Sequence, residues 1–484
     1  MIKQNSKNEI KKIKIINKEL NINCGDLDLY LDLFITDENG KTEKILTKKG
    51  DSILANFLRI MYLQMSRDIR NNVMGGTFYR YETTKSGSGI VSIGPGNNNK
   101  IRITFDTSIL SNYPAGKVTL GGFQGVNIDG RYDFTRINNT TMELENSVYQ
   151  SGWQSGTGGV NIYVPITNLN KPSYNSFRIA QIVIGTGTAA VAIDDQLLEK
   201  QIPSSATNGG LIYNNIIVSQ DTNDANSAQI TITRTFTNQA SNTVQVNEIG
   251  MLMYAGSNSM QLLVMRDLIP SGVNVAAGKT LTVNYRIKTS LNTQTDPGGF
   301  VSNFMRILYR HVANSTRAAF DINNNNITDG SSKIDFIAVK AGGYSIEYPD
   351  DESEQNWKIG IIIGSGNASV SMGDYNLNQL IEHGKSNGKM LYYGGFAEDF
   401  ETGTDYAQFK IIKAFENASG NTIQVNEYGL TIGAYAEVDG SDTFSGAKYI
   451  YLIARNVLSS SIDIQNGVIL KVVYTLKVQT GGGS

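Results

Sequence analysis

The residues of this chain whose types and spacing suggest chemistry are an acid and a base that each occur twice. Glu248 and Glu427 lie in the similar segments VNEIG and VNEYG, and Arg266 and Arg455 follow them in apolar runs. Acid–base catalysis needs a nucleophile, a base and a group that orients the base, and no such set can be assembled around these residues. Because one chain rarely keeps a catalytic pair in two copies, we expect each Glu and Arg to tie strands together, through an ion pair or backbone hydrogen bonds.

The two histidines and the single cysteine, Cys24, give no support to a catalytic or metal centre. His311 lies in a predicted helix whose repeat carries Gln64 at the same position, and His383 has no second histidine or cysteine near it in the sequence. One cysteine cannot form an intrachain disulfide or a cysteine-based zinc cluster. We interpret both histidines as structural or surface residues.

Other polar segments fit binding loops only in part. The glycine turns at 185–187 and 364–366 precede no predicted helix, whose N-terminus a phosphate-binding loop requires, so we expect tight β-turns with positive φ. The segment 321–330 offers alternating oxygen ligands but lacks the glycine and glutamate of a calcium loop, and the acidic run 350–354 fits a solvated loop. We predict that the chain is not an enzyme and has no catalytic, cofactor-binding or metal-binding residues.

The composition indicates a turn-rich β protein and argues against two kinds of partner. The 484 residues include 49 Gly, 8 Pro and 24 Tyr. Lys plus Arg number 42 and Asp plus Glu 44, a balance that gives no support to nucleic-acid binding. No apolar run approaches the roughly 20 residues that a bilayer span needs, and the N-terminal segment lacks the apolar core of a signal peptide. We expect no membrane partner, and synthesis in a reducing cytoplasm.

The elements that must position the repeated acid and base are β-strands in the segment 242–289. Apolar and polar residues alternate there with period 2, bounded by Gly, Asn and Ser, and the pattern recurs over 421–478. Strands of this kind bury one face each, so each segment predicts three or four antiparallel strands of a β-sandwich. We expect the segments 177–289 and 357–478 to superpose.

Two amphipathic helices accompany the strands, over 52–70 and 300–317. They repeat each other at a constant offset of 247 residues, with Asp51 or Ser52 placed to cap the first. Because an isolated helix of this length is marginal in water, each needs an apolar partner surface. We predict that the apolar stripe of each helix is buried, namely Phe57, Ile60 and Met61 in the first and Phe304, Ile307 and Leu308 in the second.

The offsets between repeats define the domains. The offset falls from 247 to 179 between helix and sandwich, which leaves 68 additional residues in the first copy, and it becomes 189 from Arg266 onward. We assign these 68 residues to a small inserted β-barrel. The fold class is mainly β, with duplicated helix-plus-sandwich modules. The predicted domains are an N-terminal arm over 1–25, a first module over 26–97 and 166–291, the barrel over 98–165, and a second module over 292–480.

Two parts of the sequence resemble known modules. Residues 115–159, with the turn 126–132 and the TMEL strand 141–144, resemble a small β-barrel common in tailed-phage structural proteins, related to the FCCH domain of the ubiquitin-activating enzyme. The order VNEIG, RDLIPSG and TLTVNYRI resembles a sandwich module frequent in virion proteins of tailed bacteriophages. The second copy departs at Asn456 and Ser459, which stand for Asp267 and Pro270, so we expect a different loop conformation there.

The resemblance implies a structural component of a tailed-phage virion, in a tail, neck or collar layer, that assembles as a homo-oligomer. The expected partners are other copies and other virion proteins such as portal, neck or tail proteins, and the expected location is the virion, after synthesis in the host cytoplasm. We expect the arm to pack on a neighbouring subunit or another virion protein. The alternatives are a head fibre, decoration or host-attachment protein that binds glycans or the cell surface, and a virion-borne glycan hydrolase.

Overall fold

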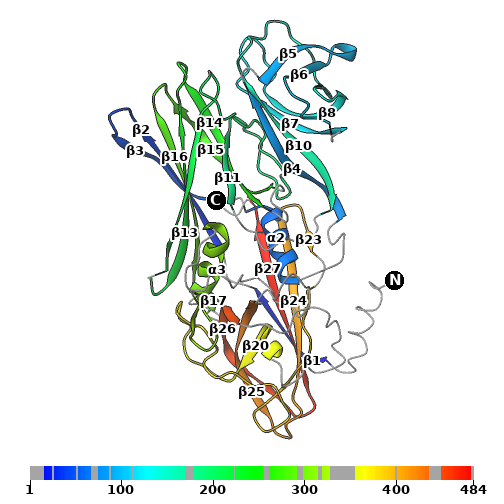
Figure 1. Ribbon diagram of the computed structural model, residues 1–484. Coiled ribbons are helices and arrows are strands. Elements are labelled where there is room, and N and C mark those ends of the chain that lie inside the picture. Colours follow the sequence, from blue (N-terminus) through cyan, green and yellow to red (C-terminus); the bar gives the residue numbers. More distant parts are fainter. Residues whose placement is uncertain are drawn as a thin grey trace.

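The chain is mainly β, as predicted, with two α-helices among the residues that the structure describes (Figure 1). The structure is a computed structural model, and the account below covers residues 16–23, 27–50, 53–66, 75–86, 89–111, 114–168, 179–222, 224–254, 261–291, 298–313, 319–327, 355–397, 400–434 and 449–480. In this part of the chain no helix is long and apolar enough to cross a membrane.

The first module is a sandwich of two antiparallel sheets. One sheet has the order β11 (Ile179–Gly185), β14 (Val244–Tyr254) and β15 (Gln261–Val275). The other has the order β12 (Ile212–Asp221), β13 (Ser227–Thr237), β16 (Thr280–Ser290), β2 (Leu27–Thr36) and β3 (Thr42–Gly50). Along β16 buried residues alternate with half-exposed ones, as the period-2 pattern predicts. The alternation places one face of each strand in the core.

The second module repeats this sandwich with small changes at its edges. One sheet has the order β17 (Gly298–Phe300), β26 (Tyr449–Ile464), β25 (Ile423–Ala434) and β20 (Gly360–Gly364). The other joins β1 (Ile16–Asn23), β27 (Ile469–Gln479) and β24 (Tyr406–Glu416), and the short strands β21 (Leu391–Tyr392), β22 (Phe396–Ala397) and β23 (Glu401–Thr402) pair with β24. A two-stranded ribbon, β18 (Ala319–Phe320) and β19 (Asn326–Ile327), follows the second helix.

The registers of the two sandwiches match at the predicted offsets. Glu248 pairs with Leu268 in the first, and Glu427 pairs with Val457 in the second. The expected difference in conformation around Asn456 is not observed. Ile249 faces Asp267 and Tyr428 faces Asn456 in the same register, and β15 and β26 both continue past this point. Continuous pairing with a shared neighbour strand leaves no room for a different loop, so the exchange of residues is local.

The two helices are shorter than predicted, α2 (Ala55–Ser66) and α3 (Ser302–Ala313). Phe300 belongs to β17 instead, because its backbone pairs with Ala454. The cap candidates 51 and 52, and residues 67–70 and 314–317, lie outside the described residues. The predicted apolar stripes are buried in both helices: Phe57, Ile60, Met61, Phe304, Ile307 and Leu308 are each at most 2% exposed.

Each helix packs on its own module and on the other one. α2 lies on β15 of the first module and on β22, β24 and β27 of the second (Figure 1). α3 lies on β26 of the second module and on β12 and β13 of the first. The ring of Tyr62 meets that of Phe409 edge-on, at 5.3 Å between centroids. As a result the two modules share one continuous apolar core, arranged like the self-complementary interface of a twofold dimer.

The inserted unit is a seven-stranded, strongly curved sheet with its own core. Its order is β4 (Gly75–Ser86), β10 (Gly159–Asn168), β7 (Ala115–Gly121), β8 (Gly130–Asn138), β9 (Thr141–Leu144), β6 (Ile101–Phe105) and β5 (Ile90–Pro95). The predicted boundaries 98–165 are therefore too narrow, since the sheet begins at Gly75 and ends at Asn168. The offset measures only the difference in length between copies, and the second copy has residues of its own between helix and sandwich.

The inserted unit contacts the first module through close backbone approaches. The Tyr163 hydroxyl donates to Gln201 Oε1 at 2.5 Å. A Cβ added at Gly121 would lie 2.5 Å from the Gln201 carbonyl oxygen, so glycine is required for this contact. The contact holds the base of the unit against the loop that follows β11, while its far end projects at one end of the molecule (Figure 1).

Part of the predicted N-terminal arm is a strand of the same chain. Residues 16–23 form β1, which pairs in parallel with β27, from Ile16 opposite Ile469 to Asn23 opposite Thr475. The expectation that this segment packs on another subunit is therefore not met in the isolated chain, because the open edge of β27 offers backbone partners nearer by. Residues 1–15 lie outside the described residues.

Candidate functional site

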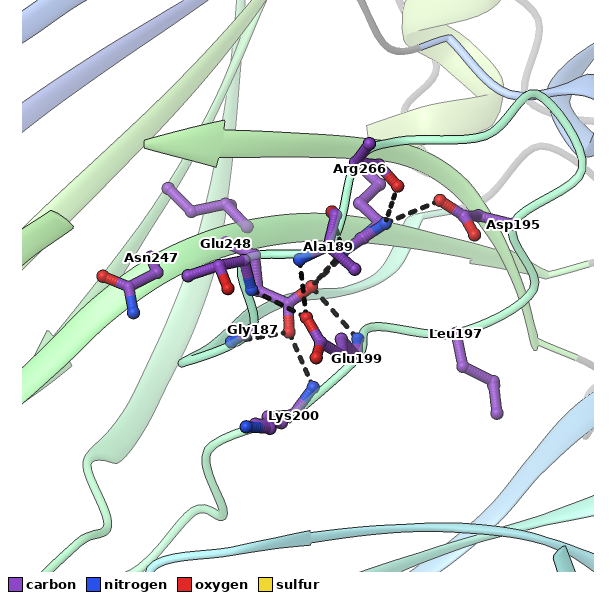
Figure 2. A network of polar contacts seen from close by, with 12 residues as sticks. Gly187, Ala189, Asp195, Leu197, Glu199, Lys200, Asn247, Glu248 and Arg266 are labelled. Carbon is purple, nitrogen blue, oxygen red and sulfur yellow. Dashed lines mark hydrogen bonds and ion pairs between the residues drawn. The ribbon is translucent and has the colours of Figure 1, made fainter. Parts of the chain in front are cut away.

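The repeated acid and base form a buried network in each module, and Figure 2 shows the network of the first. Arg266 on β15 donates through Nε to Glu248 Oε2 at 3.0 Å and through Nη1 to Asp195 Oδ2 at 2.7 Å. Its two terminal nitrogens also donate to the carbonyl oxygens of Ala190 and Ala189, at 3.2 and 2.9 Å. Arg266 is 2% exposed and Glu248 is fully buried. The donors of the guanidinium are thus directed at two carboxylates and at the loop that follows β11.

The carboxylate of Glu248 holds the same loop at two further places (Figure 2). Its Oε1 accepts hydrogen bonds from the backbone N–H groups of Gly187, at 3.2 Å, and Lys200, at 2.7 Å. Its Oε2 accepts from the N–H of Glu199 at 3.1 Å. Next to it, the Asn247 amide donates to the Thr186 carbonyl oxygen at 2.9 Å. The carboxylate therefore binds the loop where it leaves the sheet and again where it returns.

The second module contains the same network at the predicted offsets. Arg455 Nε donates to Glu427 Oε2 at 2.8 Å, and its Nη1 donates to Asp374 Oδ2 at 2.7 Å. Glu427 accepts hydrogen bonds from the N–H groups of Gly366, Asn378 and Gln379 at 3.1, 3.0 and 2.7 Å. Each distance agrees with its counterpart in the first module to within about 0.2 Å. The prediction that Glu and Arg tie the sandwich together is confirmed in both copies.

The electrostatics of the network stabilise its ionised form. Burial alone would lower the pKa of Arg266, but the nearby charges of Glu248 and Asp195 raise it above its ordinary value. A buried ion pair contributes to folding only when further hydrogen bonds satisfy its remaining donors and acceptors, and the loop N–H and carbonyl groups do so here. With every side chain directed at protein groups, the arrangement fastens a loop and leaves no polar atom aimed at a substrate.

The glycine turns have a different cause from the one predicted. Gly187 and Gly366 do not have positive φ. A Cβ at Gly187 would lie 2.4 Å from Glu248 Oε1, and a Cβ at Gly366 would lie 2.4 Å from Glu427 Oε1. Glycine is needed at both positions so that the backbone N–H can reach the buried carboxylate.

The remaining candidate residues are used locally. His383 is buried, and its Nδ1 accepts a hydrogen bond from the N–H of Tyr392 at 2.9 Å. The Asp321 carboxylate accepts from the N–H groups of Asn323 and Asn325 at 2.9 and 2.8 Å, which closes its own turn. His311 lies in α3, remote in sequence and element from His383. The end of the calcium-like segment, 328–330, and the acidic run 350–354 lie outside the described residues.

Two polar pairs were missed by sequence reasoning. The aspartates of the networks, Asp195 and Asp374, match at the offset of 179, so the repeat itself carried the signal. Asp267 is 1% exposed and its Oδ1 lies 3.3 Å from Lys48 Nζ on β3. The sequence gives no signal for that pair, because its partners are more than 200 residues apart and only one module contains it.

Within the described residues no group of three or more His, Cys, Asp or Glu is arranged to hold a metal ion. No family model, curated protein or solved structure matches the chain. Its function is therefore inferred from its own sequence and geometry.

Proposed function

We propose that this protein is a structural component of a tailed-bacteriophage virion, in a tail, neck or collar layer, and that it acts as a homo-oligomer without catalytic activity. The observation that carries the proposal is the duplicated network of Arg266 and Arg455. Both copies use their buried charged residues to fasten loops, which favours a rigid building block over an enzyme. The resemblance of the VNEIG, RDLIPSG and TLTVNYRI segments to virion modules supports the same assignment.

The shared core of the two modules also supports a structural role. In this arrangement the chain contains the equivalent of a twofold dimer whose two halves are joined covalently. Such a unit cannot open between its modules without exposing the apolar stripes of both helices. It therefore presents fixed surfaces to neighbouring copies.

One observation favours a second role for the inserted unit, attachment to a glycan or cell surface. The unit lies at one end of the molecule (Figure 1), and three apolar side chains on it are exposed: Val91, Ile137 and Val148, at 57%, 45% and 68%. A virion protein that carries such a unit outward could contact the host. This role adds to the structural one and does not require catalysis.

The test is to locate the chain in intact particles. Antibodies raised against the purified protein are used for gold labelling of virions from a producing lysate, and light scattering gives the mass of the protein in solution. We expect labelling at one axial position of the tail or neck, and an oligomer in solution. A protein that is monomeric at all concentrations and absent from purified particles contradicts the proposal. A variant that lacks the inserted unit but still assembles, and no longer adsorbs to cells, supports the second role.

A further inference from the structure

The edge of β27 carries a strand that the rest of the second module does not supply. In the first module the corresponding edge, that of β16, is covered by β2, and β2 in turn pairs with β3. Among the described residues between β16 and α3 the only strand is β17, so the second module has no such hairpin. Its sheet would end at β27 with unpaired backbone groups if residues 16–23 were elsewhere. The second module is complete only when it receives a strand from the N-terminal segment.

The strand that fills this edge is held from one side only. β1 is the last strand of its sheet, and its one strand partner in the described structure is β27. Its pairing is parallel, which is slightly less stable per residue than the antiparallel pairing of β2 with β16. β2 pairs on both sides and runs directly into β3. β1 is therefore the edge strand of the sandwiches that can leave with the least loss of pairing.

We propose that the edge of β27 is a strand-exchange site between copies of this chain, at which residues 16–23 of a neighbouring copy replace the chain's own β1 in the assembled oligomer. The proposal rests on the proposed function, because it assumes that copies assemble. Every copy carries the segment that fits the edge. The exchange preserves all backbone pairs of β1 and β27, including Glu19 opposite Lys471, so it exchanges one connection for another without loss of hydrogen bonds.

The exchange has a precedent inside the chain. α2 follows the first module in sequence and packs on the second, while α3 packs on the first, so elements are already exchanged between the two halves. The same chain thus completes its sandwiches with segments from the other half. Exchange of β1 extends this arrangement from two modules within a chain to modules in different chains, and it would link the copies of a ring one after another.

Paired cysteines report which copy supplies the strand. In a Cys24→Ser background, Glu19→Cys and Lys471→Cys place one cysteine on each strand at facing positions, and facing residues of paired strands lie within the reach of a disulfide. The protein is oxidised at low concentration, where it is monomeric, and in the assembled state, and is then denatured and separated by size without reductant. We expect single cross-linked chains from the monomer and a ladder of covalent multimers from the assembly.

A matched pair on the first module provides the control. Asp28→Cys with Lys288→Cys joins facing residues of β2 and β16, and should give single cross-linked chains in both states, because β2 is held on both sides. Oligomers that contain only intrachain cross-links at 19 and 471 overturn the exchange and leave the proposed function intact. Failure to form any disulfide at 19 and 471 also overturns the exchange. A chain that light scattering finds monomeric at every concentration overturns both.

Discussion

The two modules have the same buried network but differ at one buried position beside it, and the difference follows from the strands that surround each. In the first module Asp267 lies next to Lys48 of the β2–β3 hairpin, at 3.3 Å. In the second module the hairpin is absent and the corresponding residue is Asn456, which accepts a hydrogen bond from the Tyr474 hydroxyl at 3.3 Å. A buried charge thus occurs only where a cation is supplied to pair with it. The comparison shows that the modules diverged in charge together with their edge strands.

The network itself should respond equally in both modules. Glu248→Gln and Glu427→Gln each leave a buried arginine without its main charge partner, and removal of one partner of a buried pair costs about 3–5 kcal/mol. We expect losses in this range for both variants, measured as the free energy of unfolding in urea. A loss confined to one module would break the comparison, since it would mean that the matched geometry does not carry matched energy.

The position beside the network should respond unequally. Asn456→Asp places a carboxyl among buried groups with no lysine nearby, and we expect a loss of about 3 kcal/mol at pH 7. Burial raises the folded pKa of such a carboxyl above its unfolded value near 4, so the loss should shrink as the pH falls toward 4. The matched change Asp267→Asn should cost less and show the opposite trend with pH. Equal losses for the two variants would contradict the role of Lys48.

The hairpin of the first module should be weakened by acid. Burial alone would raise the pKa of Asp32 on β2, but hydrogen bonds from Arg286 and Thr47 outweigh it, and the net pKa is lowered. A lowered folded pKa gives stability that is complete above pH 4 and is lost as the pH falls through the folded value. We expect Asp32→Asn to cost about 1–2 kcal/mol at pH 7 and to abolish this dependence. Hydrogen exchange of the β3 amides as a function of pH measures it, with the β24 amides as the control.

The smallest expected difference concerns Glu199, which corresponds to Asn378. The Glu199 carboxylate accepts hydrogen bonds from the N–H groups of Thr188 and Ala189, at 2.7 Å each. Burial would raise the pKa of Glu199, yet these bonds bring it below its ordinary value. We expect Glu199→Asn to cost about 0.5–1 kcal/mol above pH 5, and nothing once the pH is below the folded pKa. An unfolding free energy that does not change at pH 7 would show that the two loops are equally held without this carboxylate.

The sequence predicted the sandwiches and networks well because their signals are repeated at constant offsets. The alternation of apolar residues placed the strands, and the matched Glu248 and Glu427 indicated a structural pair. The amphipathic stripe of α2 indicated that a partner surface exists, but no periodicity says which surface, so its packing on the second module was not predictable. The parallel pairing of β1 was equally hidden, because it joins the beginning of the chain to its end. The start of the inserted unit was misplaced because length differences between copies do not locate both ends of an insertion.

The reciprocal packing of the helices sets the order in which the chain can finish folding during synthesis. About 340 residues separate Ser66 at the end of α2 from Tyr406 at the start of β24, one of the strands it covers. At roughly 5–20 residues per second, the ribosome needs about 17–70 s to supply that strand. During this interval the apolar side of α2 has only half of its final surroundings, and β1 waits still longer for β27, the last strand to emerge. The first module of a nascent chain therefore depends on the last tenth of the chain to be synthesised, and a chain that terminates early would expose the helix to aggregation or to chaperones.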